Sequence, residues 1–419
     1  MNRRSFLAGV AALPLAVATA KLKPIQEVLI AQPRLSASMW IYLWDLVDEG
    51  YDDVLRRLKE NGLTSISLAT AYHTGKFLAP HDPKRKVVFL EDGTVYYSPN
   101  AKLYGRIAPI VNSLVNDGHG LREAKEHADK FGMQTRSWVV CCHNTALGMK
   151  FPEITCETAF GDKLFHNLCP SNNDVRVYFG ALLRDIASHG VDAIELEALQ
   201  FQGYTHGYHH EREGIPLNSG MKFLLGLCFC PSCAQRARAA RVDFAAVRKF
   251  TRDTLETHFA NPSKFGDQYS SVEKLPQQIF ELFFEWRTSV ITSFVTELAE
   301  ATHSFHVRLR PMISLDPSAQ KMAGINVGRI AEITGGVLAL GYVKDGAALR
   351  PPLSMVQSQI PGKTLTVGFQ LGLPESGGKV EFLDRMKVAR ELGISSYNFY
   401  NYGLVPQENL SWIKESLGG

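Results

Sequence analysis

The chain has few cysteines for its length and no large excess of charge of either sign. Seven cysteines among 419 residues are too sparse for a fold held together by disulfides. The formal net charge is +3 and no block of basic residues occurs, so we do not expect a nucleic-acid partner. With 45% hydrophobic and 21% charged residues, the composition is that of an ordinary globular protein.

Long hydrophobic runs are also lacking, apart from one near the start. Residues 1–20 carry Arg3-Arg4, then an apolar run, and end at Ala18-Thr19-Ala20. This pattern is typical of a twin-arginine export signal with its cleavage site, and the run is shorter than the roughly twenty residues of a spanning helix. We therefore expect a signal peptide over residues 1–20, a periplasmic or extracellular protein and no stable membrane span. A retained membrane anchor is the alternative.

Strand-like and helix-like segments alternate along residues 21–419. The expected strands are 38–44, 64–70, 133–141, 191–198, 306–315, 337–343, 365–371 and 394–402. Long insertions follow the second, third and fourth of them, the first with a hairpin of 86–90 and 94–97, the last mostly helical. No G-x-G-x-x-G or P-loop motif follows a strand, which disfavours an open nucleotide-binding sheet. The pattern predicts a single (β/α)8 TIM barrel whose insertions lie on the C-terminal face, where active sites of this fold are built.

Three of the cysteines stand close together in the sequence. Cys228, Cys230 and Cys233 form a C-x-C-x-x-C cluster. Three thiolates at this spacing suit a tetrahedral zinc site that needs one further ligand. Cys169, in a loop that enters a predicted helix, is the preferred fourth ligand. The alternatives are Cys156, His209 and His210.

These cysteines resemble a motif of the family 42 glycoside hydrolases, the barrel β-galactosidases. Several of those enzymes hold zinc with a lone cysteine in a C-P-[NS]-[NS] stretch after strand three and a C-x-C-x-x-C group after strand four. The stretch Cys169-Pro-Ser-Asn and the cluster Cys228 to Cys233 match it in place and order. The resemblance implies a sugar-cleaving barrel with a closed, structural zinc site of four cysteine ligands. A looser similarity is to uncharacterised glycoside-hydrolase-like barrels with an acidic fourth strand.

Two glutamates lie in the fourth predicted strand. Glu195 and Glu197 are two residues apart, so both side chains point to the same face. Buried carboxylates cost free energy unless they are used or paired, and we expect Arg308 or Arg310 of the next strand to pair with the deeper one. The outer one, Glu197, is then placed to act as a general acid/base, with Glu195 as the alternative.

The resemblance also implies where the other catalytic group lies. In the resembling enzymes an Asn precedes the acid/base, whereas Leu196 stands there in this chain. Their nucleophile is a Glu at the end of strand seven, where this chain has Gln370, with Glu375 five residues later. Asp316 and Asp345 are further carboxylates after strands five and six. The second carboxylate, for which Glu375 is the candidate, and the choice between retention and inversion are thus left open.

Aromatic, histidine and amide side chains occur at several predicted strand ends. Such groups stack on sugar rings and bond sugar hydroxyls. Trp40, Tyr42 and Trp44 alternate along the first predicted strand and therefore share a face. The expected substrate-binding residues are Trp40, Tyr42, Tyr72, His73, His143, Asn144, His206, Arg310, Gln370, Asn398 and Tyr400.

Together these features predict an exported glycoside hydrolase that acts on a small glycoside or oligosaccharide. Two other functions fit the same residues. One is a metal-dependent lyase or isomerase of a sugar or sugar acid, with an ion held by Glu195 or Glu197 and by His73, His143 or His206. The other is a carbohydrate-binding barrel without catalysis. The sequence allows an oligomer without indicating one.

Overall fold

The computed structural model describes residues 35–205, 210–265, 267–372 and 376–418. The chain divides into a short unit, Met1–Arg34, and a compact unit from Leu35 to the C-terminus, and the compact unit is the one described here. The predicted export signal, His206, His209 and Glu375 lie outside the described residues.

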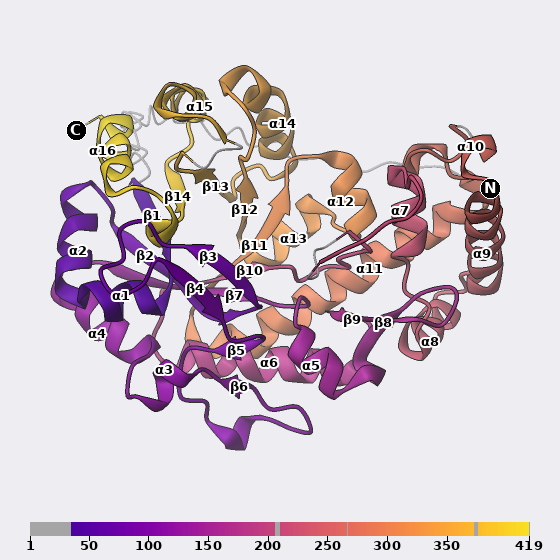
Figure 1. The fold of residues 1–419 in the computed structure, drawn as a ribbon, viewed down its shortest axis with the longest axis horizontal. Coiled ribbons are helices and arrows are strands. Elements are labelled where there is room, and N and C mark those ends of the chain that lie inside the picture. Colours follow the sequence, from indigo (N-terminus) through magenta and orange to yellow (C-terminus); the bar gives the residue numbers. More distant parts are fainter. Residues whose placement is uncertain (1–34, 206–209, 266, 373–375, 419) are drawn as a thin grey trace, which may run out of the picture. The chain divides into compact units, whose positions relative to one another are not determined.

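Eight parallel strands close into a barrel (Figure 1). The sheet closes because β1 pairs with both β14 and β2. The strands are β1 (Ser36–Ile41), β2 (Ser65–Tyr72), β7 (Gln134–Val140), β10 (Ala193–Glu197), β11 (Arg308–Ser314), β12 (Gly336–Leu340), β13 (Thr364–Gln370) and β14 (Ser396–Tyr400). The predicted (β/α)8 TIM barrel is confirmed, as are the insertions after the second, third and fourth barrel strands.

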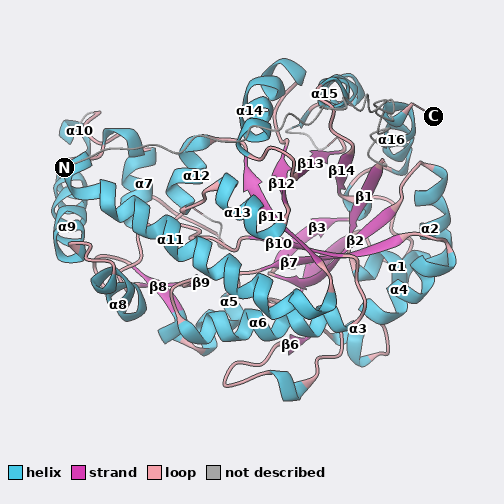
Figure 2. Ribbon diagram, turned by 180° about the vertical axis from the view of Figure 1, so that it is seen from behind, coloured by secondary structure: helices cyan, strands magenta, loops and turns pink. Residues whose placement is uncertain are grey.

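Helices surround the barrel and form most of the third insertion (Figure 2). No helix of the described residues is both long and apolar enough to cross a membrane. The α-helices are α1 (Leu43–Glu49), α2 (Tyr51–Glu60), α3 (Ser113–Asn116), α4 (Leu121–Lys130), α5 (Thr145–Lys150), α6 (Asn173–Ser188), α7 (Ser219–Leu225), α8 (Pro231–Ala239), α9 (Phe244–Ala260), α10 (Pro262–Phe265), α11 (Gln277–Thr302), α12 (Pro317–Ala323), α13 (Val327–Thr334), α14 (Gly346–Gln359), α15 (Lys379–Glu391) and α16 (Leu410–Leu417).

Two details of the first part of the barrel differ from the prediction. The first strand ends at Ile41, and Tyr42 is the N-cap of α1, so Trp44 lies on a helix and not on the strand. The predicted hairpin of 86–90 with 94–97 is wrong. Strand β4 (Val87–Leu90) pairs with the preceding β3 (Gly75–Leu78), because the turn at Gly93 directs β5 (Thr94–Val95) onto β2 and β6 (Ile110–Val111).

The second and third insertions contact each other beside the barrel. The second contains the antiparallel strands β8 (Thr155–Glu157) and β9 (Lys163–Leu168). The third contains α7 to α11, of which α8, α9 and α10 lie on the opposite side of this unit from α2 and α16 in both ribbon views (Figures 1 and 2). The amide of Phe229, between two cysteines of the third insertion, donates a hydrogen bond of 2.7 Å to the carbonyl of Glu157 in β8.

The barrel interior carries polar side chains where most barrels of this fold have aliphatic ones. Inward positions of β2, β10 and β14 hold Ser67, Glu195 and Asn398, all fully buried. Trp40 of β1 extends across the interior toward β13, where a Cβ at position 368 would lie 2.7 Å from its ring. Gly368 therefore makes room for Trp40.

Candidate functional site

The deeper glutamate of β10 is fully enclosed and hydrogen-bonded from several strands. Glu195 is 0% exposed. Its Oε2 accepts from Trp40 Nε1 at 2.9 Å and Ser67 Oγ at 2.5 Å, and Asn398 Nδ2 donates to both carboxylate oxygens at 2.8 and 2.9 Å. Burial raises the pKa of Glu195, while attraction to Arg136 opposes that rise. The carboxylate thus joins β1, β2, β7, β10 and β14 at one level of the barrel.

The arginine beside Glu195 is not one of the two that the sequence suggested. Arg136 of β7 pairs with it, at 3.4 Å between Nη1 and Oε1. The guanidinium of Arg310 instead donates to the carbonyls of Leu309 and Thr334, near the N-terminal end of β12. The predicted pairing with Arg308 or Arg310 is therefore wrong. It failed because the register of β7 with β10 places Arg136 and Glu195 on inward positions of adjacent strands. The sequence alone does not show which residues of two distant strands lie side by side.

The outer glutamate of β10 has a different environment. Glu197 is partly buried at the carboxyl end of the strand, and its Oε2 accepts a 2.6 Å hydrogen bond from Trp138 Nε1. Within the described part of the chain, this is the one side-chain donor that bonds its carboxylate. Burial raises the pKa of Glu197, and the Trp138 bond, which favours the charged form, partly opposes the rise.

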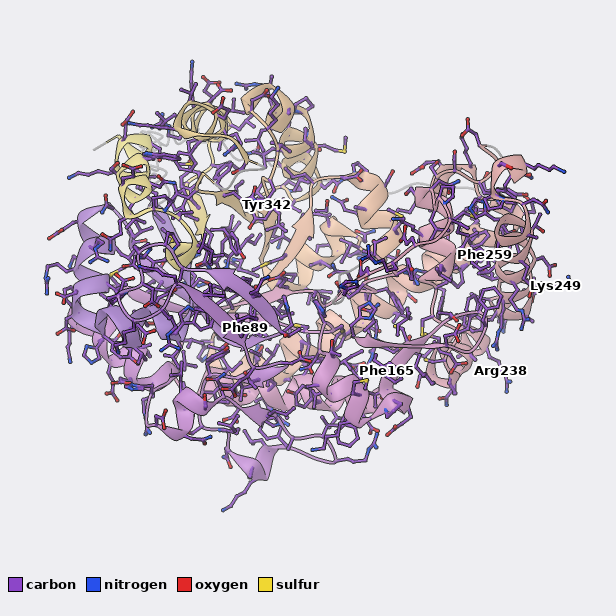
Figure 3. All side chains as sticks on the ribbon, in the orientation of Figure 1. Phe89, Phe165, Arg238, Lys249, Phe259 and Tyr342 are labelled. Carbon is purple, nitrogen blue, oxygen red and sulfur yellow. The ribbon has the colours of Figure 1, made fainter. Side chains whose placement is uncertain are left out.

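Aromatic rings surround this carboxylate. Tyr400 packs edge-on against Trp40 and Trp138, with ring centroids 5.9 and 6.0 Å apart. The ring of Tyr72 lies 4.8 Å from that of Trp138. Tyr342, labelled in Figure 3, follows β12, and its ring lies 6.3 Å from that of Tyr400. Apolar rings next to a carboxylate exclude water and keep the protonated form available.

A cavity opens beside Glu197. Its volume is about 620 Å³, within the size range of small-molecule sites. Its walls come from the segment after β10, from α7 and α11 of the third insertion, and from β11 with α12. Residues that line it include Glu197, Gln200, Tyr204, Phe223, Arg287 and Gln320.

Two of the predicted histidines, His73 and His143, stack next to this aromatic group. His73 lies against Tyr72, with ring centroids 4.4 Å apart, and against His143 at 4.3 Å. Burial lowers the pKa of His73. Asn144 is the N-cap of α5, since its side chain accepts from Leu147 N at 2.9 Å. The structure brings Trp40, Tyr42, Tyr72, His73, His143, Asn398 and Tyr400 together at this end of the barrel.

The other strand-end residues have structural contacts of their own. The Asp316 carboxylate caps α12, and that of Asp345 caps α14, so both rim carboxylates bond backbone amides. Gln370 ends β13 directly opposite Tyr400 of β14 and is 8% exposed. Tyr42 is fully buried and stacks on Trp44 at 4.2 Å.

Sequence reasoning missed four neighbours of the two glutamates. They are Ser67, Arg136, Trp138 and Tyr342. A signal for two of them was present, because Arg136 and Trp138 alternate along the third predicted strand and therefore share its inward face. Nothing in the sequence indicated that this face would meet the face of Glu195 and Glu197.

The four predicted zinc ligands meet in a second buried centre, hereafter the four-cysteine site. The ligand atoms of Cys169, Cys228, Cys230 and Cys233 all lie within 4.8 Å of one another. From the Cys169 sulfur, the other three lie at 3.5, 3.6 and 3.7 Å. Disulfide sulfurs would be about 2.05 Å apart. Zn–S bonds of about 2.3 Å in a tetrahedron place sulfurs about 3.8 Å apart, so the spacing fits a metal.

The surroundings of the four-cysteine site also suit a negatively charged centre. Arg176 donates to the carbonyl of Pro170 at 2.7 Å, and Arg236 to that of Ser171 at 2.8 Å, directly after Cys169. Cys230 is the N-cap of α8, and its sulfur accepts a hydrogen bond of 3.5 Å from the amide of Cys233. A fifth cysteine, Cys156 of β8, contacts the site but is not part of the group of four.

Comparison with known proteins supports the fold. Neither a protein-family model nor a curated protein sequence matches the chain. Among similar solved structures is the glycoside hydrolase domain of PgaB (BpsB) from Bordetella bronchiseptica, with a TM-score of 0.57, 11% identity, and coverage of 89% of this chain and 95% of that one. The β-galactosidase from Bacillus circulans gives 0.54 at 12% identity, covering 88% of this chain and 50% of its own. The β-galactosidase from Marinomonas ef1 has a TM-score of 0.54 at 8% identity, with coverage of 91% of this chain and 58% of that one.

The chain thus spans 50% and 58% of the length of these two β-galactosidases, and nearly all of the PgaB domain. At such identities the likeness establishes a TIM-barrel fold of the kind found in glycoside hydrolases.

Proposed function

We propose that this protein is a glycoside hydrolase of small glycosides or oligosaccharides, with Glu197 as general acid/base. The observation that carries the proposal is the environment of Glu197 at the end of β10, which differs from that of the enclosed Glu195. Glu197 faces a cavity of about 620 Å³, receives one bond from Trp138 and has a pKa raised by burial. A carboxylic acid with a raised pKa beside a substrate-sized cavity suits protonation of a glycosidic oxygen. The fold shared with glycoside hydrolases adds support.

In this proposal the neighbours of Glu197 have distinct tasks. The acid donates its proton to the leaving oxygen, and the Trp138 N–H then stabilises the carboxylate that remains. Tyr342, 38% exposed beside Tyr400, offers a ring face and a hydroxyl to the sugar. Glu195 fixes Trp40 and Asn398 and so acts as a positioning residue. Glu375 is the proposed second carboxylate, as nucleophile or as base.

The zinc site and the export signal belong to the same proposal. The four cysteines would hold zinc in a closed site without an open coordination position, so the metal would support the fold and take no part in hydrolysis. Residues 1–20 would direct the folded protein out of the cytoplasm and then be removed.

The test is turnover of a panel of aryl glycosides by the wild type and by Glu197→Gln. Loss of general acid/base catalysis should lower kcat/KM by about 10²–10⁴-fold on the most active substrate. Glu285→Gln, on the exposed face of α11, is the matched control and should keep full activity. A Glu197→Gln variant with wild-type turnover on every substrate would overturn the proposal.

A carbohydrate-binding barrel without catalysis is the second candidate. The observation that favours it is Gln370, because an amide stands at the end of β13, where the resemblance implies a nucleophile. Calorimetry with oligosaccharides separates the two functions. Binding without hydrolysis by the wild type would favour the second.

Within the described residues, the four cysteines are the group with metal-ligand geometry, and neither Glu195 with His73 nor Glu197 with His143 forms another.

A further inference from the structure

One cation in the wall of the cavity beside Glu197, hereafter the Glu197 cavity, has no negatively charged partner. Of the described residues that line this cavity, three carry charge, and these are Glu197, Lys222 and Arg287. Lys222 is paired with Glu213, at 3.2 Å between Nζ and Oε2. Within the described part of the chain, no carboxylate forms an ion pair with Arg287, although this side chain is only 2% exposed. An enclosed charge without a counter-charge is unfavourable, and a bound anion would relieve this.

Neighbouring groups hold the guanidinium of Arg287 at the cavity wall. Its central carbon lies 4.1 Å from the centroid of the Phe201 ring and 5.6 Å from that of Phe223, and both of these residues line the cavity. Its Nη2 donates a 2.6 Å hydrogen bond to the carbonyl of Met322, which also lines the cavity. Contact with aromatic rings uses the faces of a guanidinium and leaves its in-plane N–H groups for hydrogen bonds. The in-plane N–H groups that Met322 does not use are thus left for a ligand.

Two side chains of the cavity wall also leave polar atoms without a hydrogen-bond partner. Within the described residues, Arg287 donates the one bond to Met322, and its Nε is buried without an acceptor. The side-chain oxygen of Gln200, another residue that lines the cavity, is buried without a donor. Buried polar groups are nearly always hydrogen-bonded in folded proteins. A cationic donor and a neutral acceptor in the wall of one cavity suit a ligand that carries both an anionic group and hydroxyls.

We propose that the Glu197 cavity accepts an acidic sugar and that Arg287 bonds its anionic substituent, a carboxylate or a sulfate ester. A hydroxyl of the sugar bonds Gln200, and the anion provides the counter-charge that Arg287 lacks. A charge-assisted bond in an enclosed site is stronger than a bond between neutral groups, so this contact selects acidic over neutral sugars. Arg287 is thus a binding residue that determines specificity. The inference rests on the proposed function of the cavity and names its substrate class.

The first test compares substrates that differ in one substituent of the sugar. Aryl glucosides and galactosides of both anomers are assayed beside the glucuronides, galacturonides and 6-sulfates with the same aryl group. The wild type should cleave one acidic substrate with a kcat/KM about 10–100-fold above that of its neutral counterpart, the equivalent of one hydrogen bond to a charged group. The preferred substituent identifies the anion. A wild type that prefers the neutral member of every pair, or that does not distinguish the members, would overturn the inference and leave hydrolysis by Glu197 standing.

The second test assigns the preference to Arg287. Arg287→Met should lower kcat/KM for the acidic substrate by about 10–100-fold and leave that for the neutral substrate near the wild-type value. Arg287→Lys keeps the charge and should retain part of the preference. Equal losses on both substrates in Arg287→Met would mean that the side chain only supports the cavity wall, and would overturn the inference.

The matched control is Arg248→Met. Arg248 also lies over an aromatic ring, with its guanidinium 5.9 Å from the centroid of Phe229, and donates to a carbonyl, that of Ala159 at 3.0 Å. It lies outside the wall of the Glu197 cavity. The ratio of kcat/KM between acidic and neutral substrates should therefore stay at the wild-type value. A ratio that falls equally in Arg248→Met and Arg287→Met would overturn the inference.

The third test measures binding and needs no hydrolysis. The Glu197→Gln variant is titrated in a calorimeter with uronic-acid trisaccharides, with sulfated trisaccharides and with neutral trisaccharides of the same linkage. One acidic ligand should bind about 10–100-fold more tightly than its neutral counterpart, and Arg287→Met added to Glu197→Gln should abolish the difference. This result would support the inference even if no aryl glycoside is cleaved, in which case the proposed hydrolysis alone fails. Equal binding of acidic and neutral ligands, or no binding of either, would overturn the inference.

Discussion

The structure contains two buried polar centres that are built differently. One is the barrel interior around Glu195 and Glu197, and the other is the four-cysteine site. Both bury ionisable groups, and both have hydrogen-bond donors and arginines around them. The barrel centre draws on five strands that are far apart in sequence, with partners up to 203 positions from Glu195. In the four-cysteine site, three of the four sulfurs come from one stretch of six residues, Cys228–Cys233.

The difference shows which buried polar centres a sequence can reveal. A short ligand motif has a spacing that can be recognised, because one turn fixes the geometry of three ligands at once. A carboxylate at the centre of a barrel has partners chosen by strand register and barrel closure. Within the barrel centre the two glutamates also differ, since Glu195 is saturated with donors while Glu197 accepts one bond and faces a cavity.

The largest effect should follow from breaking the buried pair of the barrel centre. Arg136→Met leaves Glu195 without its positive partner in a fully enclosed position, which should destabilise the fold by about 3–5 kcal/mol. Urea unfolding measures the loss. Arg310→Met, which removes bonds to carbonyls only, should cost less. A larger loss in Arg310→Met would restore the pairing expected from the sequence.

A somewhat smaller loss of stability should follow from replacing one cysteine of the four-cysteine site. With zinc in excess, wild type should gain about 3–4 kcal/mol of stability from metal binding, the value expected at several hundred times the dissociation constant. Cys169→Ser should lose most of this gain. Cys156→Ser should keep it, because Cys156 contacts the site without belonging to the group of four. Thermal unfolding with and without Zn²⁺ distinguishes the two variants, and equal losses would make Cys156 a ligand.

The sequence predicted the barrel, its strand positions, the four sulfurs and the placement of both glutamates on one inward face. Most of these depend on local periodicity and spacing, whereas Cys169 was chosen for its place in a loop and for the resemblance to the family 42 motif. It failed at the hairpin after β2 and at the arginine beside Glu195, both of which depend on which strand lies next to which. It separated the deeper Glu195 from the outer Glu197 but could not name their hydrogen-bond partners, since Ser67, Trp138 and Asn398 approach from other strands.

The effect of pH on stability tests whether burial raises the pKa of Glu197. Burial raises the pKa of Glu197 in the native state, so wild type loses stability as pH rises from the usual glutamate value through the raised one. Glutamine cannot ionise, so Glu197→Gln should be more stable than wild type by about 0.5–2 kcal/mol at mildly alkaline pH, with the gain vanishing in acid. Urea unfolding across pH tests this. A variant that is less stable at every pH would mean that the carboxylate is held by stabilising bonds, as Glu195 is.

The smallest effect concerns the single donor to Glu197. The Trp138 N–H favours the charged carboxylate, so its removal in Trp138→Phe should raise the pKa of Glu197 further. If Glu197 must be protonated to act, the alkaline limb of kcat/KM should move upward by about one pH unit, the equivalent of one such bond. Trp44→Phe, which removes an indole that stacks on Tyr42, is the matched control and should leave the limb in place. A limb that moves downward in Trp138→Phe, or equally in both variants, would mean that another group titrates. Glu197, which faces the cavity, would then have no better support as the catalytic group than the fully buried Glu195.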